Sequence, residues 1–166
     1  MLKYLKFLLK STNQHGVHSP FVYAYVTRGL YRGKKYRGPV HRRILFRTIA
    51  YFGIGSIHIA EASDERLSAS LKTCFPGIAI NPAERPRITC YNKPLIPGEV
   101  SRFLSETDFK GDHILVLEKI HRNKTAEKTW EMVKKNGKVV VTIDLFYAGI
   151  VFFREGQARE DFIIRP

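Results

Sequence analysis

The sequence predicts an α/β fold built on a doubly wound, mostly parallel sheet, and three observations support this. From residue 56 onward, short apolar runs alternate with helical patterns, which is typical of βαβ units. Near the C-terminus, the apolar runs 138–145 and 149–153 are too close in sequence for a parallel crossover, so they must form an antiparallel hairpin. Before residue 56 the patterns are only helical. We therefore expect one structural domain, with a helical N-terminal extension over residues 1–55 packed on a sheet core over residues 56–166.

The first expected helix, over residues 2–10, is amphipathic. Lysines share one face and apolar residues cover the other: Lys3, Lys6 and Lys10 against Leu2, Leu5, Phe7, Leu8 and Leu9. The interpretation that we favour is a helix that packs on the domain and leaves its lysine face in solvent. The alternative is a helix that binds a membrane surface or nucleic acid.

The remaining elements follow in order. Ser19 and Pro20 form a good N-cap and N1 pair for a helix over 20–31, and a third helix spans 41–52. The core is expected to contain strands at 56–62, 77–81, 87–91, 112–121, 138–145 and 149–153, and helices at 63–75, 97–109 and 123–137. We expect Ser63 to begin its helix with a capping box and Gly137 to cap the C-terminus of the last helix. The charged tail that follows ends in another apolar run.

The chain is strongly basic, with a formal net charge of +13. This favours nucleic acid, an anionic membrane surface or an acidic partner, and we give equal weight to a basic surface without such a ligand. Eight cationic residues between Arg28 and Arg47 form a basic belt: Arg28, Arg32, Lys34, Lys35, Arg37, Arg42, Arg43 and Arg47. Tyr31 and Tyr36 lie among them, and cations beside aromatic rings suit phosphate contact combined with base stacking. The belt matches no RRM, KH or helix-turn-helix pattern.

Cys74 and Cys90 lack C-x-x-C spacing, which indicates reduced thiols in a cytoplasmic protein. Lysines interrupt the apolar N-terminus, so a signal peptide is not expected, and no run approaches the roughly 18 apolar residues of a membrane span.

His15 and His18 lie three apart without further ligands at suitable spacing, so no metal site is predicted. His58 lies inside a strand and is expected to be a core or sheet-face residue. The sequence contains no P-loop, G-x-S-x-G or H-E-x-x-H motif.

Three segments resemble the small class I S-adenosylmethionine (SAM) dependent methyltransferases common in Bacteroidetes. They are 2–27, which includes HGVHSPFV, 42–59 (RRILFRTIAYFGIGSIHI) and 129–166, which includes TWEMVKKNGKVVVTIDLFYAG. The resemblance implies a Rossmann-like fold of the class I methyltransferase type, here shortened by one βα unit, whose mostly parallel sheet ends in an antiparallel hairpin. It also implies a SAM site after the first strand, formed by an acidic residue and a glycine-rich turn that lets the backbone approach the ligand.

At that site the sequence departs from the family pattern. Ile59 stands at the acidic position, and Glu61 and Glu65 stand at glycine positions. The resemblance also implies an acid at the end of the second strand for the ribose hydroxyls, and the sequence has Asn81 there, which can bond a hydroxyl only without charge assistance. We therefore expect a degenerate cofactor site.

The fourth strand ends in LEKIHRNK, which places Glu118 and His121 near the edge of the sheet where α/β proteins bind ligands. They are the two candidates for an acid/base pair, and a polar loop without catalytic role is the alternative.

Three functions remain open from the sequence. The first is a methyltransferase-like protein that no longer binds SAM and has a non-catalytic interaction role, that is, a pseudoenzyme. The second is an active methyltransferase, directed to oxygen or nitrogen, with an atypical SAM pocket. The third is a basic module that binds nucleic acid or another polyanion through the Arg28–Arg47 belt.

Overall fold

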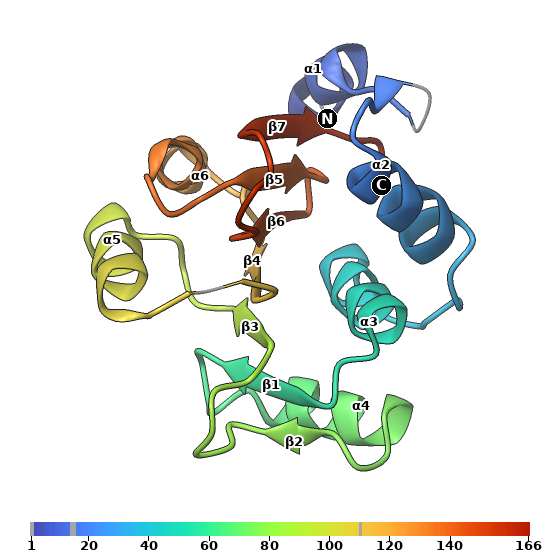
Figure 1. Ribbon diagram of the computed structural model, residues 1–166, viewed down its shortest axis with the longest axis vertical. Coiled ribbons are helices and arrows are strands. Elements are labelled where there is room, and N and C mark those ends of the chain that lie inside the picture. The colour runs from blue at the N-terminus through green and yellow to red at the C-terminus, as the bar shows by residue number, and fades with distance from the viewer. Residues whose placement is uncertain (1, 14–15, 110) are drawn as a thin grey trace.

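The computed structural model describes residues 2–13, 16–109 and 111–166. Its centre is a seven-stranded sheet in the order β2-β1-β3-β4-β6-β5-β7 (Figure 1). The strands are β1 (Ser56–Ile59), β2 (Ala79–Ile80), β3 (Ile88–Tyr91), β4 (Ile114–Glu118), β5 (Val141–Asp144), β6 (Ala148–Phe152) and β7 (Glu160–Ile163). All pairings are parallel except those of β6, which runs antiparallel to both β4 and β5. The predicted α/β class with a mostly parallel sheet is confirmed, and the architecture is compatible with a Rossmann-like fold.

The helices lie on both faces of this sheet (Figure 1). They are α1 (Leu2–Lys10), α2 (Pro20–Ala24), α3 (Val40–Phe52), α4 (Glu65–Cys74), α5 (Pro97–Glu106) and α6 (Lys124–Lys135), with a π-helix, η2 (Tyr25–Tyr31), continuing α2. A hydrophobic cluster lies on each face of the sheet. The first packs the sheet against α2, η2, α3 and α4, and the second packs it against α5 and α6. Alternate residues of β4 enter different clusters, Val116 the first and Leu117 the second, as the period-two geometry of a strand requires. Such a strand is covered on both faces, which explains its continuous apolar sequence.

The predicted antiparallel hairpin is present as β5 and β6, but it does not lie at the edge of the sheet. Strand β6 inserts between β4 and β5, where it pairs with both. The apolar end of the tail then forms β7, which pairs in parallel with β5. Beyond it, the backbone N–H of Thr12 donates to Ile163 O at 2.8 Å, so the N-terminal segment continues this edge.

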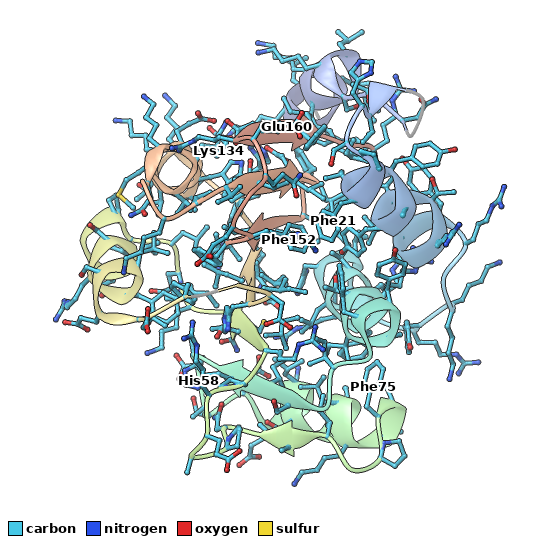
Figure 2. The ribbon with its side chains drawn as sticks, viewed as in Figure 1. Phe21, His58, Phe75, Lys134, Phe152 and Glu160 are labelled. Atoms are coloured by element: carbon cyan, nitrogen blue, oxygen red, sulfur yellow. The ribbon has the colours of Figure 1, made fainter. Side chains whose placement is uncertain are left out.

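The helix predicted over 20–31 begins as expected, since Ser19 Oγ accepts the Val22 N–H at 3.4 Å. From Tyr25 it widens into a π-helix, and Arg32 N donates to Thr27 O at 3.0 Å. Gly29 in this segment packs on the ring of Tyr51, where a Cβ would come within 2.9 Å of ring carbon Cγ. In Figure 2, Phe21 of α2 lies beside Phe152 of β6, with ring centroids 5.0 Å apart. Aromatic contacts therefore fix the N-terminal helices against the middle of the sheet.

Two predicted caps are wrong. The N-cap of α4 is Asp64, not Ser63, because the Asp64 carboxylate accepts the Leu67 N–H at 2.9 Å. The C-cap of α6 is Asn136, with extended backbone, and not Gly137. In the first case two neighbouring residues are both good caps, and contacts from elsewhere in the fold select the second.

The predicted orientation of α1 is confirmed only in part, because the lysines are exposed and Phe7 packs as expected, but three of the leucines do not pack. Phe7 and Tyr4 carry the packed side, and Phe7 lies 5.2 Å from the ring of Phe146. Lys3 pairs with Glu127 of α6 at 2.8 Å. Leu2, Leu5 and Leu9 instead point to solvent. The aromatic residues, which bury more area than leucine, have determined which side packs.

Candidate site at the strand ends

The carboxyl ends of β1, β3 and β4 meet at one edge of the sheet, because these strands are parallel neighbours. Glu118 is the last residue of β4, Asn92 follows β3, and Asp64 follows β1. Arg42, in the first turn of α3, reaches across these strand ends. The four side chains form a connected polar cluster at this edge of the sheet.

Arg42 joins two acids that lie on different elements. Its Nη2 donates to Asp64 Oδ2, and its Nε lies 3.1 Å from Glu118 Oε1. The Glu118 side chain is only 1% exposed and that of Arg42 is 16% exposed. Water is therefore largely excluded from this ion pair, and each charge depends on its partner.

Besides Arg42, two groups hold Asp64 in place. Its carboxylate accepts the Leu67 N–H and the Asn92 amide at 3.1 Å, and Asn92 Oδ1 in turn accepts the Glu61 N–H at 2.8 Å. Burial alone would raise the pKa of Asp64. Hydrogen bonds from Leu67, Arg42 and Asn92 outweigh burial, so the pKa lies below its usual value. Asp64 is thus a fixed anion.

Glu118 has the opposite electrostatic balance. Burial raises its pKa, and the charges of Arg42 and Lys119 oppose that rise only in part. Cys90 donates its thiol to Glu118 Oε1 at 3.6 Å, and burial together with the Glu118 charge raises the pKa of this thiol. His41 Nε2 lies 3.8 Å from Glu118 Oε2, but burial and the charges of Lys119 and Arg42 lower the pKa of His41 to about 4. At neutral pH His41 is therefore uncharged.

Two polar atoms of this cluster have no hydrogen-bond partner within the described residues. They are Arg42 Nη1 and Glu118 Oε2, both buried. A cavity of about 390 Å³ lies between α3 and α4 and is lined by Arg37, His41, Arg42, Asp64, Arg66 and Lys119, among others. A second, of about 400 Å³, includes Asn92 and Glu118. Lys119 lines both cavities and has a left-handed backbone (φ 58°), which is costly for a lysine.

The residues predicted to hold the cofactor are placed differently from the expected pattern. Ile59 is buried in the hydrophobic cluster. Asn81 has a left-handed backbone (φ 49°), and its Oδ1 accepts the Ile59 N–H at 2.6 Å. Glu61 accepts a hydrogen bond from Ser63 Oγ at 2.7 Å, and Glu65 is exposed. Neither glutamate lines the two cavities. The acid that bonds Arg42 at the strand ends is Asp64, and the only signal for it in the sequence is an acidic residue in the turn after β1.

Glu118 and His121 are not partners. His121 Nε2 lies 2.8 Å from Asp144 Oδ2, and its Nδ1 is 3.7 Å from Glu127 Oε1. Trp130 donates its indole N–H to the same Asp144 oxygen at 3.1 Å. The acid/base pair proposed from the sequence is therefore replaced by a cluster around Asp144, which ends β5.

The basic belt divides into two sets. Arg42, Arg43 and Arg47 are half-buried, and Arg47 Nη1 donates to Leu30 O at 2.7 Å. The exposed set is Arg28, Arg32, Lys34, Lys35 and Arg37. Tyr36 packs between Phe46 and Phe75, and Tyr31 donates its hydroxyl to Arg165 O at 2.9 Å. Both tyrosines are partly buried against the first hydrophobic cluster, so they are less available for base stacking than fully exposed rings.

The described histidines do not form a metal centre. Within residues 2–13, 16–109 and 111–166, no group of three or more His, Cys, Asp or Glu side chains is placed to hold a metal ion. His15 lies outside the described residues. His58 lies in β1, as expected, and His113 bonds Thr89 Oγ1 through Nε2 at 3.1 Å.

None of the described helices is long and apolar enough to cross a bilayer. In comparisons with protein-family models, with curated proteins and with solved structures, the chain matched none.

Proposed function

We propose that this chain is a divergent relative of class I SAM-dependent methyltransferases whose strand-end crevice no longer accepts the cofactor, and that it has a non-catalytic interaction role. The observation that carries the proposal is the Arg42 guanidinium, which bridges Asp64 and Glu118 across the ends of β1 and β4. A cofactor bound over these strand ends would have to displace a buried ion pair. Breaking such a pair leaves uncompensated charge and is strongly unfavourable.

The relationship to methyltransferases is supported by the sheet order. A single reversed strand, β6, lies between two strands of the opposite direction, and the hairpin that supplies it comes at the end of the alternating region. An antiparallel hairpin that closes the alternating region is what the resemblance of the C-terminal segment implies. On the other side of β1 there is only one strand, the two-residue β2, which agrees with the expected loss of one βα unit.

The residues at the strand ends are a poor fit for SAM in two further respects. The turn from Ala60 to Asp64 contains no glycine, so its backbone cannot be approached as closely as a glycine-rich turn. Asn81 stands where an acid would accept the ribose hydroxyls, and its side-chain oxygen already accepts the Ile59 N–H. Releasing it would leave a backbone donor unpaired.

Isothermal titration calorimetry with SAM tests the proposal. We expect no binding heat at micromolar to hundred-micromolar ligand, and no thermal stabilisation, from SAM or from its demethylated product. An established methyltransferase titrated with the same ligand stocks is the positive control. Binding in the micromolar range would overturn the proposal.

One observation favours the second candidate, an active methyltransferase with an atypical pocket. Glu61 and Glu65 turn away from the cavity beside Asp64, so the two acids at the former glycine positions do not fill it. This candidate requires SAM binding together with transfer of a labelled methyl group to an oxygen or nitrogen acceptor. The same titration therefore separates it from the first.

The exposed basic residues favour a third candidate, a module that binds nucleic acid or another polyanion. Five exposed cationic side chains, on η2 and on the connection from η2 to α3, are available to phosphate: Arg28, Arg32, Lys34, Lys35 and Arg37. This candidate predicts an affinity for RNA or DNA that falls steeply with salt. Absence of binding at low salt would exclude it.

A further inference from the structure

Three leucines of α1 form an exposed stripe, defined here as Leu2, Leu5 and Leu9. Their exposed fractions are 70%, 52% and 87%. Within the described residues only two other large apolar side chains, Tyr23 and Ile96, are exposed. Three of the five therefore gather on one nine-residue helix, and clustering of this kind marks an interaction surface more strongly than scattered exposed leucines.

The leucine stripe is held outward by the packing on the other side of α1. Phe7 is only 7% exposed and contacts Phe146, with ring centroids 5.2 Å apart. Tyr4 lies 4.9 Å from the same ring. The helix stands at the edge of the molecule above β7 (Figure 1). The stripe is thus presented by a docked helix, and no rearrangement of the fold is needed to expose it.

Positive charge lies next to the leucine stripe. Helix α1 contains three lysines and no acidic residue. At 100° per residue, Lys6 and Lys10 fall on the flank between the stripe and the packed side, and both are exposed. Arg165 adds another cation at the C-terminal end of α1, where its guanidinium donates to Leu8 O and Ser11 Oγ, both at 3.3 Å.

We propose that α1 docks the protein on an anionic lipid bilayer, with the leucine stripe inserted at the level of the upper acyl chains and the lysines among the headgroups. A bilayer offers an apolar phase and a negatively charged layer side by side, which is the order found across this helix. Lysine stems can lie along apolar surface while their ammonium groups stay in water. At nine residues, or about 14 Å, α1 lies along the surface and cannot span it.

Two other occupants fit this helix less well. A second copy of α1 would bring its lysines toward those of the first, and like charges at short range repel. Nucleic acid would use the lysines and leave the leucine stripe in water. The bilayer is the surface that uses both features, and the net charge of +13 adds long-range attraction to it.

Vesicle sedimentation with the full chain tests this proposal. We expect binding to vesicles that contain phosphatidylglycerol, much weaker binding to pure phosphatidylcholine vesicles, and a decline with added salt. The triple variant Leu2→Gln/Leu5→Gln/Leu9→Gln should bind phosphatidylglycerol vesicles about tenfold or more weakly, because three apolar side chains no longer leave water. The matched control is Ile96→Gln, which removes an exposed apolar side chain outside α1 and should bind as the unaltered protein does.

A second variant reports insertion directly. In Leu9→Trp, the new indole should shift its emission to the blue on phosphatidylglycerol vesicles and be quenched by brominated acyl chains, while the fully buried Trp130 gives a constant background. Equal vesicle binding by the triple variant and the unaltered protein would overturn the proposal, as would an indole emission in Leu9→Trp that brominated chains leave unquenched. A dimer in solution that the triple variant abolishes, without vesicle binding, would assign the stripe to a second copy instead. The test uses no residue of the strand-end site, so its result is independent of the SAM titration.

Discussion

The Arg42 guanidinium joins the first turn of α3 to the end of β4, with Nε 3.1 Å from Oε1 of a Glu118 that is almost wholly buried. A helix of the N-terminal extension is therefore tied electrostatically to the centre of the sheet. Because Glu118 Oε2 has no hydrogen-bond partner within the described residues, the carboxylate depends on Arg42 for most of its compensation.

Replacing Arg42 with methionine should lower the free energy of unfolding by about 3 kcal/mol, since it leaves a buried charge unpaired. Adding Glu118→Gln to Arg42→Met should recover part of that loss. Urea denaturation of the two single variants and the double variant gives the coupling energy. Arg66→Met is the matched control, because Arg66 is exposed beside the same cavity, and it should change stability by less than about 0.5 kcal/mol. Additive effects at Arg42 and Glu118 would contradict the pairing.

Two buried histidines should make the protein lose stability in mild acid. Burial lowers the pKa of His41 and of His113 to about 4, from 6.5 in the unfolded chain. Between these values the unfolded state binds more protons than the native state, so stability falls as pH drops from about 6.5 to 4. Each neutral histidine contributes on the order of 2 kcal/mol to this loss. Denaturation midpoints at pH 7, 6, 5 and 4.5 measure it.

The variants His41→Gln and His113→Gln should each flatten that pH dependence. Glu118 acts in the opposite direction, because its raised pKa makes the native state bind the extra proton and so lowers stability as pH rises above 4.5. Burial also lowers the pKa of His58, so the double histidine variant should keep a smaller slope in which His58 and Glu118 oppose each other. A pH dependence as steep as that of the unaltered protein would show that neither histidine is kept neutral by the fold.

Gly149 in β6 should not tolerate a side chain. A Cβ at this position would lie 2.6 Å from Cζ3 of Trp130, which is fully buried. Gly149→Ala should destabilise the protein by about 2 kcal/mol through overpacking. Gly98→Ala is the control: Gly98 lies in α5 with open space at its Cβ, and alanine favours a helix there. Thermal unfolding should separate the two variants clearly, and equal melting temperatures would argue against the close Trp130 contact.

Asp144 should not tolerate replacement by asparagine. Its Oδ2 is bonded to His121 and accepts the Trp130 indole N–H, and its Oδ1 accepts the Phe146 N–H. In Asp144→Asn an NH₂ group must face a donor, so we expect a loss of about 2 kcal/mol and a changed near-ultraviolet circular dichroism of Trp130. Asp161→Asn provides the comparison, since its remaining oxygen can still accept the Thr142 hydroxyl. Unchanged Trp130 dichroism in Asp144→Asn would contradict the indole bond.

The alternation of strands and helices could be predicted because it depends on short-range sequence features, namely apolar runs, helical periodicity and capping residues. The run of residues 112–121 is apolar enough to require burial on both faces, and β4 is buried throughout. Ser19 and Pro20 marked a helix start that the structure confirms. The close sequence spacing of β5 and β6 predicted their antiparallel pairing, because so short a connection cannot join two parallel neighbouring strands.

The placement of side chains between distant elements could not be predicted in this way. The choice of Asp64 over Ser63 as cap depends on Arg42 and Asn92, which lie more than twenty residues away on either side. The orientation of α1 depends on Phe146, and the partner of His121 on where β5 ends. Likewise, local sequence does not reveal that β6 would insert between β4 and β5. The hairpin determines that β6 pairs with β5, but it does not determine which strand pairs with the other edge of β6.

That insertion has a consequence for how the chain is made. Strand β6 alone bonds the β2-β1-β3-β4 portion of the described sheet to the β5-β7 portion. On a ribosome, which releases the chain from its N-terminus, β4 and β5 each present an unpaired edge until residues 148–152 emerge, and β7 is made only after them. Folding of the complete sheet must therefore wait until residues 148–152 have emerged, and a nascent chain stalled before that point would expose unpaired strand edges to chaperones or to its neighbours.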